Sequence, residues 1–350
     1  MPTVDTASLE AAGAAIFVGA GLATEEARLV AHSLILANLM GHDSHGVIRI
    51  PQYLEHIKAG KMVPGRRIEI VREAPASAVV RGGAGFGQTL CHQATELAIE
   101  KAKTCSVAAV ELYECGHIGR LGEYVEAAAA QNMIGLVTCN NHGAGLWQPP
   151  FGGIDRRMSP NPIAVGVPTG KDFPIVVDMT TSVVAEGKIR VARNRGEEIP
   201  EGWALDAEGN PTTDATGFYG PPRGAILPFG GQAAHKGYAL SVVVDILSGA
   251  LGGSGCSSDP EATGGRNGVF ILAIDIAAFT GLDHFEEEVD GFIDFLKSSR
   301  LMPGFDGISL PGEIEFRRRR ERERQGLELD NETLRQLHEA GKAVGVDVTL

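Results

Sequence analysis

The sequence predicts an α/β protein with helical segments at both ends of the chain. The chain has 350 residues, of which 43% are hydrophobic, so it can bury a large core, and its length is typical of about two domains. In the middle of the chain, segments with strand-like patterns alternate with segments at helical spacing. This alternation is typical of the α/β class.

Helical spacing dominates the first 72 residues. A helix is expected over 24–41, where an acidic first turn precedes apolar residues at helical spacing and a glycine ends the pattern. A second helix is expected over 50–59, again followed by a glycine. No convincing strand is found before about residue 72, so the first part of the chain is expected to be helical.

The middle of the chain carries the predicted sheet. Strands are expected at 77–81, 107–112, 134–139, 174–178 and 269–274, and helices at 90–103, 121–131, 238–251 and 286–298. The last of these helices is expected to pack on the sheet. Residues 190–223 are rich in Gly, Pro, Asp and Glu, which favours a long surface excursion.

Two helices are expected in the tail, over 315–325 and 331–344. Whether they rejoin the N-terminal helices is not decided by the sequence. The run RRRRERER at 317–324 is expected to form an exposed helix face, with the ion pairs Glu313–Arg317 and Arg319–Glu323.

Charge and cysteine content narrow the function classes. The net charge of −13 repels phosphate backbones and anionic lipids, so no nucleic acid and no membrane is expected as partner. Five cysteines at wide spacing, without a CxxC pair, are expected to be reduced core thiols. The first 20 residues lack the basic start and the continuous apolar stretch of a leader, so a cytoplasmic location is expected. No segment has metal-ligand spacing, so no metal is expected.

A glycine-rich segment, GGAGFGQ at 82–88, lies between a predicted strand and a predicted helix. Its position is that of a dinucleotide-binding fingerprint, but its spacing is GxGxG where the fingerprint needs GxGxxG. A phosphate loop and a ligand-free turn are both compatible with these residues.

Residues 41–49, GHDSHGVIR, form the densest polar cluster of the N-terminal region. His45 and Arg49 are one turn apart if a helix starts here, so both could face one pocket. A guanidinium binds a carboxylate through two parallel hydrogen bonds, and an imidazole can donate or accept a proton at the adjacent oxygen. The pattern therefore suits a 2-oxo acid. The alternative is that Asp43 and Ser44 cap the helix and that His45 is a surface histidine.

Further polar positions follow predicted strands. His117 follows the second strand, at the edge of the sheet where α/β sites form, and is a second acid–base candidate. Asn140 follows the third strand, and Asp178 ends the fourth, where its carboxylate could orient an imidazole. Simpler explanations are a backbone hydrogen bond for His117 and helix capping for Asp178.

Two weaker candidates lie later in the chain. His235 and Lys236 begin an apolar helix, where a lysine and free amides suit a phosphate. Pro311, Gly312 and Glu313 form a polar loop.

Taken together, these segments resemble the malate/L-lactate dehydrogenase family, which also includes ureidoglycolate, sulfolactate and 2,3-diketogulonate oxidoreductases and an imino-acid reductase. The resemblance covers nearly the whole chain. It is carried by GHDSHGVIR at 41–49, GHIGRLGEY at 116–124, SPNPIAVGVP at 159–168, DMTTS at 178–182, HKGYALS at 235–241 and LPGE at 310–313. Many relatives have Gly-Thr where this chain has Ser159 and Pro160, so one contact with substrate or nicotinamide is in doubt.

The resemblance implies an α/β fold with a non-Rossmann NAD(P)-binding domain, whose sheet is mixed and largely antiparallel. It also implies a discontinuous helical domain made of residues 1–72 and 300–350, with the NAD(P)-binding domain at 73–299. Active sites are expected near a homodimer interface. The glycine-rich loop at 82–88 should then not hold the pyrophosphate.

Residue roles follow from the same resemblance. His45 matches the family's proton donor, Arg49 its carboxylate anchor, Asp178 the partner that orients His45, and His117 the base of some members. Ser44 and Asn140 would line the substrate pocket. The expected cofactor contacts are Asp178, Met179, Thr180, Thr181, His235, Lys236, Pro311, Gly312 and Glu313.

The expected function is hydride transfer between NAD or NADP and a small anionic 2-oxo or 2-hydroxy acid. Within enzymes, the alternative is a reductase of cyclic imino acids. From other classes, the alternatives are a catalytically silent binding protein on the same scaffold and a conventional Rossmann dehydrogenase with its pyrophosphate at 83–87. The particular acid and the choice between NAD and NADP are not marked by any motif.

Overall fold

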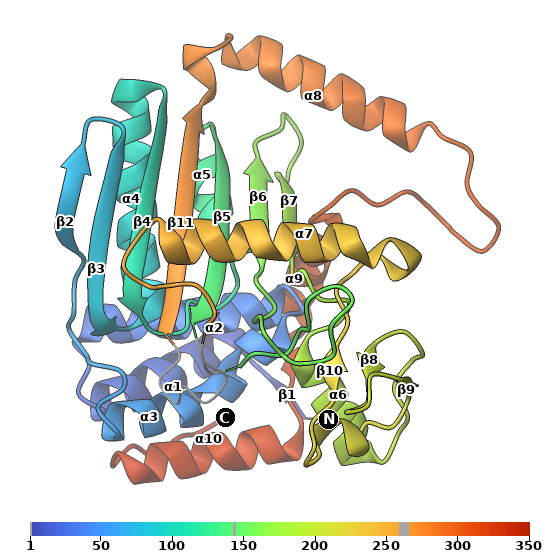
Figure 1. Cartoon of the computed structure of the whole chain (residues 1–350). Helices are drawn as coiled ribbons and strands as arrows, with labels where there is room; N and C mark the ends of the chain where they lie inside the picture. The colour runs from blue at the N-terminus through green and yellow to red at the C-terminus, as the bar shows by residue number, and fades with distance from the viewer. Residues whose placement is uncertain (1, 143–144, 259–265) are drawn as a thin grey trace.

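The computed structural model describes residues 2–142, 145–258 and 266–350. Its main feature is a seven-stranded sheet (Figure 1). In spatial order the strands are β2 (Glu69–Ala74), β3 (Ser77–Gly85), β4 (Val107–Cys115), β11 (Arg266–Asp275), β5 (Met133–His142), β6 (Ile163–Val167) and β7 (Ile175–Met179). Only β3 and β4 pair in parallel, and every other neighbouring pair is antiparallel. The α/β class and the mixed sheet are therefore confirmed.

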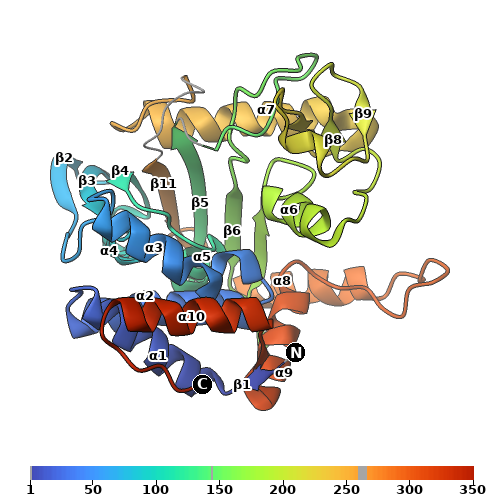
Figure 2. The ribbon, with the colours of Figure 1, turned by 90° about the horizontal axis from the view of Figure 1, so that it is seen from below.

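Helices cover the two faces of the sheet differently. Helices α4 (Gly87–Cys105) and α5 (Gly122–Ala129) pack on one face, and α7 (Ala234–Asp245), which continues through a π-helical turn at Ile246–Ala250, crosses the other (Figure 2). Alternate residues of β4, such as Val110 and Leu112, point into the core under α4 and α5, where they are fully buried. This core fixes the strand ends that carry candidate residues.

The two ends of the chain lie together. Strand β1 (Thr3–Val4) pairs with β12 (Leu327–Glu328), and a second core joins α1 (Thr6–Gly19), α2 (Thr24–Leu39) and α3 (Ile50–Lys58) to α10 (Asn331–Ala343). Helix α9 (Glu313–Gln325) packs against α2. The tail helices therefore do rejoin the N-terminal helices. The exact domain boundaries remain a prediction.

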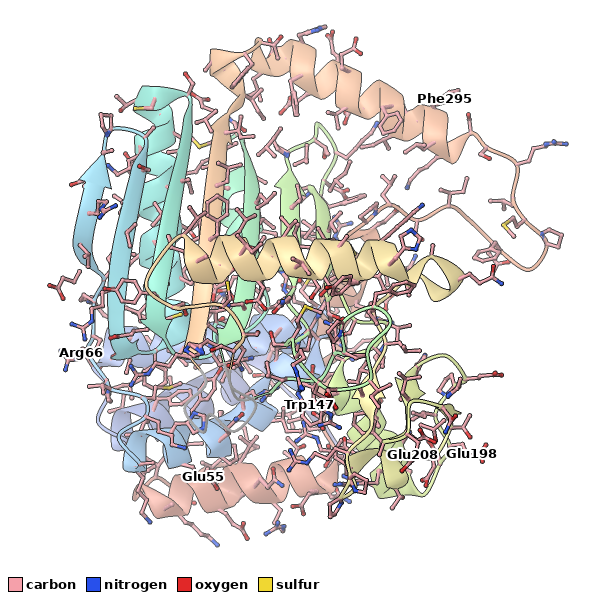
Figure 3. All side chains as sticks on the ribbon, viewed as in Figure 1. Glu55, Arg66, Trp147, Glu198, Glu208 and Phe295 are labelled. Atoms are coloured by element: carbon pink, nitrogen blue, oxygen red, sulfur yellow. The ribbon has the colours of Figure 1, made fainter. Side chains whose placement is uncertain are left out.

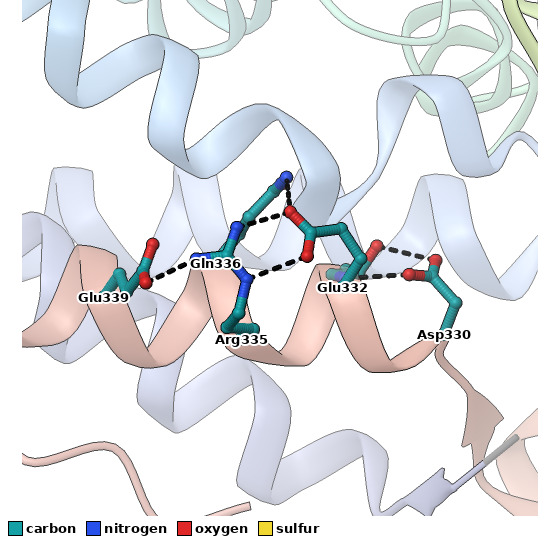
Figure 4. A network of polar contacts seen from close by, with 6 residues as sticks. Asp330, Glu332, Arg335, Gln336 and Glu339 are labelled. Carbon is teal, nitrogen blue, oxygen red and sulfur yellow. Dashed lines mark hydrogen bonds and ion pairs between the residues drawn. The ribbon is translucent and has the colours of Figure 1, made fainter. Parts of the chain in front are cut away.

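Helix α10 is stabilised at its start and along its exposed face (Figure 4). The carboxylate of Asp330 accepts hydrogen bonds from the backbone N–H and the hydroxyl of Thr333, both at 2.8 Å, which caps the helix. Arg335 pairs with Glu332 and Glu339, one turn away on either side. These interactions stabilise α10, the tail helix that packs against the N-terminal helices.

Three expectations about single elements were wrong: the packing of the helix at 286–298, the absence of a strand near residue 72 and the surface excursion at 190–223. Helix α8 (Leu282–Lys297) does not pack on the sheet, because only Ile293 of this helix is buried, while Phe295 is 75% exposed (Figure 3). Strand β2 was missed because all six of its residues are exposed, which leaves no alternation of burial to detect.

The surface excursion expected at 190–223 belongs to a packed module with a small core of its own. It contains α6 (Glu186–Arg195), β8 (Ala204–Leu205), β9 (Pro211–Thr212) and β10 (Ala225–Ile226). Within the described part of the chain, no helix combines the length and the apolar character needed to cross a bilayer.

Candidate active site

The polar cluster at 41–49 folds into two short 3₁₀ turns, Asp43–His45 and Val47–Arg49, directly after α2. Asn38, buried at the end of α2, holds both turns. Its Nδ2 donates to Asp43 Oδ1 at 2.8 Å, and its Oδ1 accepts from the backbone N–H of Val47 at 2.9 Å. A Cβ at Gly46 would overlap the Asn38 side chain, so glycine is required there. The Asn38 side chain therefore holds both turns in place.

Helix α9, near the C-terminal end of the sequence, also binds this segment. The Arg322 guanidinium donates to the carbonyl oxygen of Asn38 and, at 3.1 Å, to Asp43. Arg319 pairs with Glu323 as expected. The expected pairing of Glu313 with Arg317 was wrong, because the Glu313 carboxylate binds Lys297 at 2.6 Å. The basic run thus contributes to the site's support as well as to an exposed face.

The two candidate acid–base residues lie face to face. The rings of His45 and His117 stack with their centroids 5.4 Å apart and their planes at 14°. Ser44 Oγ lies 3.1 Å from Nδ1 of His45, and the Tyr53 hydroxyl lies 2.8 Å from Nδ1 of His117. Gln88 Nε2 donates to the Tyr53 oxygen at 2.8 Å. Among the described residues, no hydrogen bond reaches Nε2 of either ring, so both Nε2 atoms can face a ligand.

The glycine-rich segment places His117 and leaves no space for a phosphate. A Cβ at Gly87, the first residue of α4, would overlap the carbonyl oxygens of Gly116 and His117. Those oxygens occupy the helix N-terminus, where a phosphate would have to bind, and they repel anions. The glycine therefore serves the close approach of two backbones.

Arg49 forms its side-chain hydrogen bonds with neutral groups. Its Nε donates to the Ser44 carbonyl at 2.7 Å and its Nη1 to Gln52 at 2.8 Å. Among residues 2–142, 145–258 and 266–350, no carboxylate forms an ion pair with it. The side chain is half-buried, and burial lowers its pKa. A partly desolvated guanidinium of this kind is chemically suited to bind an anion.

Burial also sets the protonation of the rings. It lowers the pKa of His45 to about 3, with smaller contributions from the positive charges of Arg49, His42 and Arg120. The pKa of His117 lies well below its usual value, mainly because of burial. Burial raises the pKa of Tyr53 to about 12, so its hydroxyl keeps its proton. At neutral pH both imidazoles are uncharged and can accept a proton.

A cleft of about 500 Å³ lies beside these turns. It is lined by His42, Arg120, Glu126, residues 176–179, residues 309–312 and 314–316. Asp178 accepts from the backbone N–H of Gly122 at 2.7 Å, and its charge opposes the lowering of the His42 pKa that burial causes. No contact joins Asp178 to His45 in the described structure, so that pairing stays a prediction.

Only some of the expected cofactor residues line the cleft. Asp178, Met179, Pro311 and Gly312 line the cleft. The hydroxyl of Thr180 donates a hydrogen bond to the carbonyl of Ser182, and that of Thr181 donates to the carbonyl of Pro160. The Glu313 carboxylate accepts hydrogen bonds from the Leu310 N–H and from Lys297. His235 and Lys236 are exposed at the start of α7, away from the cleft lining. Their contacts with a cofactor stay predictions.

Asn140, expected in the substrate pocket, is buried and saturated by hydrogen bonds. Its Nδ2 donates to Asp245 Oδ1 at 2.9 Å and to the Gly255 carbonyl at 3.0 Å, and its Oδ1 accepts from Gly268 N–H at 3.2 Å. Its substrate role therefore stays a prediction without support from these contacts.

The cleft fits a nicotinamide cofactor in size and character. Its volume lies in the usual range for ligand pockets, and its wall combines apolar residues of β7 and α9 with a few polar groups. The Nε of the buried Arg120 has no hydrogen-bond partner in the described residues, so a polar ligand group could satisfy it. A second hollow, of about 490 Å³, is lined mainly by carboxylates of α8, which repel an anionic substrate.

Several residues of the site were not singled out from the sequence. Tyr53 lies four residues after Arg49, which is a helical spacing that could have indicated it. His42 and Arg120 lie within quoted segments, but nothing in their spacing marked them. Asn38 gave no signal, because a lone asparagine in an apolar helix has no recognisable pattern.

Comparison with known proteins gives consistent matches. The family model described as malate/L-lactate dehydrogenase matches residues 4–338. A malate dehydrogenase of Pyrococcus horikoshii is 39% identical over 334 residues, which are 93% of this chain and 91% of the relative. An L-sulfolactate dehydrogenase of Methanocaldococcus jannaschii is 37% identical over 333 residues, 94% of this chain and 93% of the relative.

Solved structures agree with these matches. The structure of a putative malate/lactate dehydrogenase from E. coli superposes with a TM-score of 0.92 at 34% identity, covering 99% of this chain and 96% of the other. A Δ1-piperideine-2-carboxylate reductase from Pseudomonas syringae superposes with a TM-score of 0.82 at 28% identity, covering 97% of this chain and 100% of the other.

Proposed function

The chain belongs to the malate/L-lactate dehydrogenase family and is a 2-hydroxyacid dehydrogenase, and we propose that Arg49 binds the substrate's carboxylate while His45 exchanges the proton on the adjacent oxygen. The observation that carries this proposal is the half-buried guanidinium of Arg49, which has no carboxylate partner among the described residues and lies beside two uncharged, stacked imidazoles. A small 2-oxo or 2-hydroxy acid matches that arrangement.

NAD or NADP, when bound, supplies or takes up the hydride. In the oxidative direction, His45 accepts the hydroxyl proton at Nε2, while the Ser44 hydroxyl holds the ring at Nδ1. The ring of His117 stacks on the ring of His45, and His117 can accept the proton in place of His45. Asp178, Met179, Pro311 and Gly312 would hold the cofactor in the cleft.

Substrate binding prepares His45 for the reverse direction. The positive charge of Arg49 contributes to the low pKa of His45. A carboxylate bound to Arg49 offsets that charge and so raises the His45 pKa. The imidazole can then carry the proton that the reduced oxygen needs.

The test is a kinetic assay with a panel of 2-oxo acids, with and without added amines, using NADH and NADPH. We expect ketoacid reduction without amine, and we expect His45→Ala to lower kcat by about 10²- to 10⁴-fold while the cofactor Kd changes little. Equal losses of turnover and cofactor binding would assign His45 a structural role. Turnover only with amines present would favour a cyclic imino acid, the substrate class named for the Pseudomonas syringae reductase.

A homodimer is part of the proposal. Helix α8 and the segment after it expose several large apolar side chains: Phe292, Phe295, Leu301, Met302 and Phe305. A second copy covering this surface would bury it. Sedimentation velocity at micromolar concentration distinguishes a dimer from a monomer.

A further inference from the structure

Helix α6 brings a second guanidinium to the substrate side of the site. Gly187, in the first turn of α6, faces Ser44: a Cβ built on this glycine would lie 3.8 Å from Ser44 Cβ and 4.0 Å from Nη2 of Arg190. Ser44 in turn accepts the hydrogen bond from Arg49 through its carbonyl and contacts His45 through its hydroxyl. Arg190 therefore lies close to the pair that binds and protonates the substrate.

Gly187 lies between these groups. A methyl group added to this glycine would be at ordinary van der Waals distance from both Ser44 Cβ and Arg190 Nη2, so the two side chains border the same point of α6. An anionic ligand held by Arg49 would therefore bind with the guanidinium of Arg190 nearby.

Arg190 is only loosely paired with a carboxylate. Arg190 Nη2 lies 3.3 Å from Glu186 Oε2, which is longer than the usual distance of a charge-assisted hydrogen bond. Glu186 also accepts a hydrogen bond from the Tyr219 hydroxyl at 2.7 Å. Burial is the main cause of the lowered pKa of Arg49, and the positive charge of Arg190 lowers that pKa further, while the negative charge of Glu186 opposes both. Glu186 thus lies near two guanidiniums, in a chain whose net charge is −13.

We propose that Arg190 binds a second anionic group, carried on C3 of the substrate, and so selects 2-oxo diacids over 2-oxo monoacids. This inference rests on the proposed function, because it assumes that Arg49 holds the first carboxylate. The second group, a carboxylate or a sulfonate, separates the two guanidiniums and relieves their repulsion. Both groups are flat or compact anions that accept hydrogen bonds from the exposed Nη atoms of Arg190.

The test compares three acids that differ only at C3: pyruvate, which has no further group, 2-oxobutyrate, which adds a methyl, and oxaloacetate, which adds a carboxylate. Sulfopyruvate provides the sulfonate arm. The quantity measured is the ratio of kcat/KM for each diacid to kcat/KM for 2-oxobutyrate. In Arg190→Gln we expect this ratio to fall by about 10- to 100-fold, mainly through KM of the diacid, because one charge-assisted interaction is lost.

Matched variants separate this role from a general effect of charge. Arg195 lies on the same helix, exposed and near its C-terminal end, so Arg195→Gln removes an equal charge away from Ser44. The ratio should stay within about twofold of wild type in Arg195→Gln, and Arg190→Lys should keep part of the preference. A sulfonate preference that survives when the carboxylate preference is lost would limit Arg190 to the carboxylate.

Two results would contradict different parts of the proposal. A ratio unchanged in Arg190→Gln, or lowered equally in Arg195→Gln, would overturn the role of Arg190 and leave the dehydrogenase assignment intact. A wild-type enzyme that reduces none of these acids would overturn the proposed function, and this inference with it.

Discussion

His45 differs from an exposed histidine in the pH range over which it can act. Its pKa is lowered from the ordinary value of 6.5 to about 3, because burial disfavours the charged ring and Arg49 repels it. The unprotonated ring, which accepts a proton, therefore persists as the pH falls below 6.5 and is lost only as the pH approaches 3. An ordinary histidine would lose it near neutrality.

This shift predicts the pH profile of oxidation. We expect kcat/KM for a 2-hydroxy acid to stay nearly level from about pH 8 down to about pH 5. The measurement is initial-rate kinetics across that range, with activity regained at pH 8 as the check that the enzyme has not unfolded. An acidic limb with a midpoint near 6.5 would show that the catalytic ring is solvated like a free imidazole.

Residue types alone predicted part of the site. His45 and Arg49 were found because they lie four residues apart in one dense polar cluster, although the structure places them on two separate 3₁₀ turns and not on one helix. His117 lies beside them only because β4 and α4 pack against the helical end of the chain, and such packing cannot be predicted from a local sequence pattern. Arg190 could not be predicted for the same reason, since it lies near Ser44 on a helix of a segment that was predicted as a surface excursion.

At the scale of elements, the two 3₁₀ turns at 43–49 depend on Asn38. The backbone N–H of Val47 has the Asn38 amide oxygen as its partner, and Val47 is buried. Arg322 of α9 donates to the backbone carbonyl of Asn38 and to the Asp43 carboxylate, so α2, the turns and α9 meet at Asn38. A change at Asn38 is therefore expected to shift Ser44, His45 and Arg49 together.

Asn38→Ala tests that dependence. We expect a loss of about 1–3 kcal/mol in unfolding free energy, because a buried N–H loses its partner, and a clear rise in KM for the acid. The control is Asp330→Ala, which removes the cap of α10 at a cost of about 0.5–2 kcal/mol without touching the turns. Urea unfolding and steady-state kinetics give both quantities. Equal KM values in the two variants would show that Asn38 contributes stability alone.

Elements with strong local patterns were predicted and others were not. The helix at 24–41 and the strands at 107–112 and 134–139 appear as α2, β4 and β5, because one face of each is buried. The amphipathic pattern of α8 led to the wrong prediction that this helix packs on the sheet, because the pattern marks an apolar face but does not say what covers it; among the described residues, only Ile293 of the helix is buried.

At the scale of the whole molecule, the site lies where the two ends of the chain meet the sheet. The turns at 43–49 come from the helical end, and His117 and Asp178 come from strands β4 and β7 or the loops that follow them. The chain is acidic as a whole, yet Arg49 and Arg190 form a local positive site. Such a local charge can hold a small anion that the overall field repels.

The central claim is that the Arg49 guanidinium holds the substrate's carboxylate, and Arg49→Lys tests it most directly. Lysine keeps the charge but loses the planar pair of donors. We predict that KM for the 2-oxo acid rises about tenfold or more, while the Kd for the reduced cofactor, followed by its fluorescence, stays near the wild-type value. A KM for the acid equal to that of the wild-type enzyme would contradict the claim.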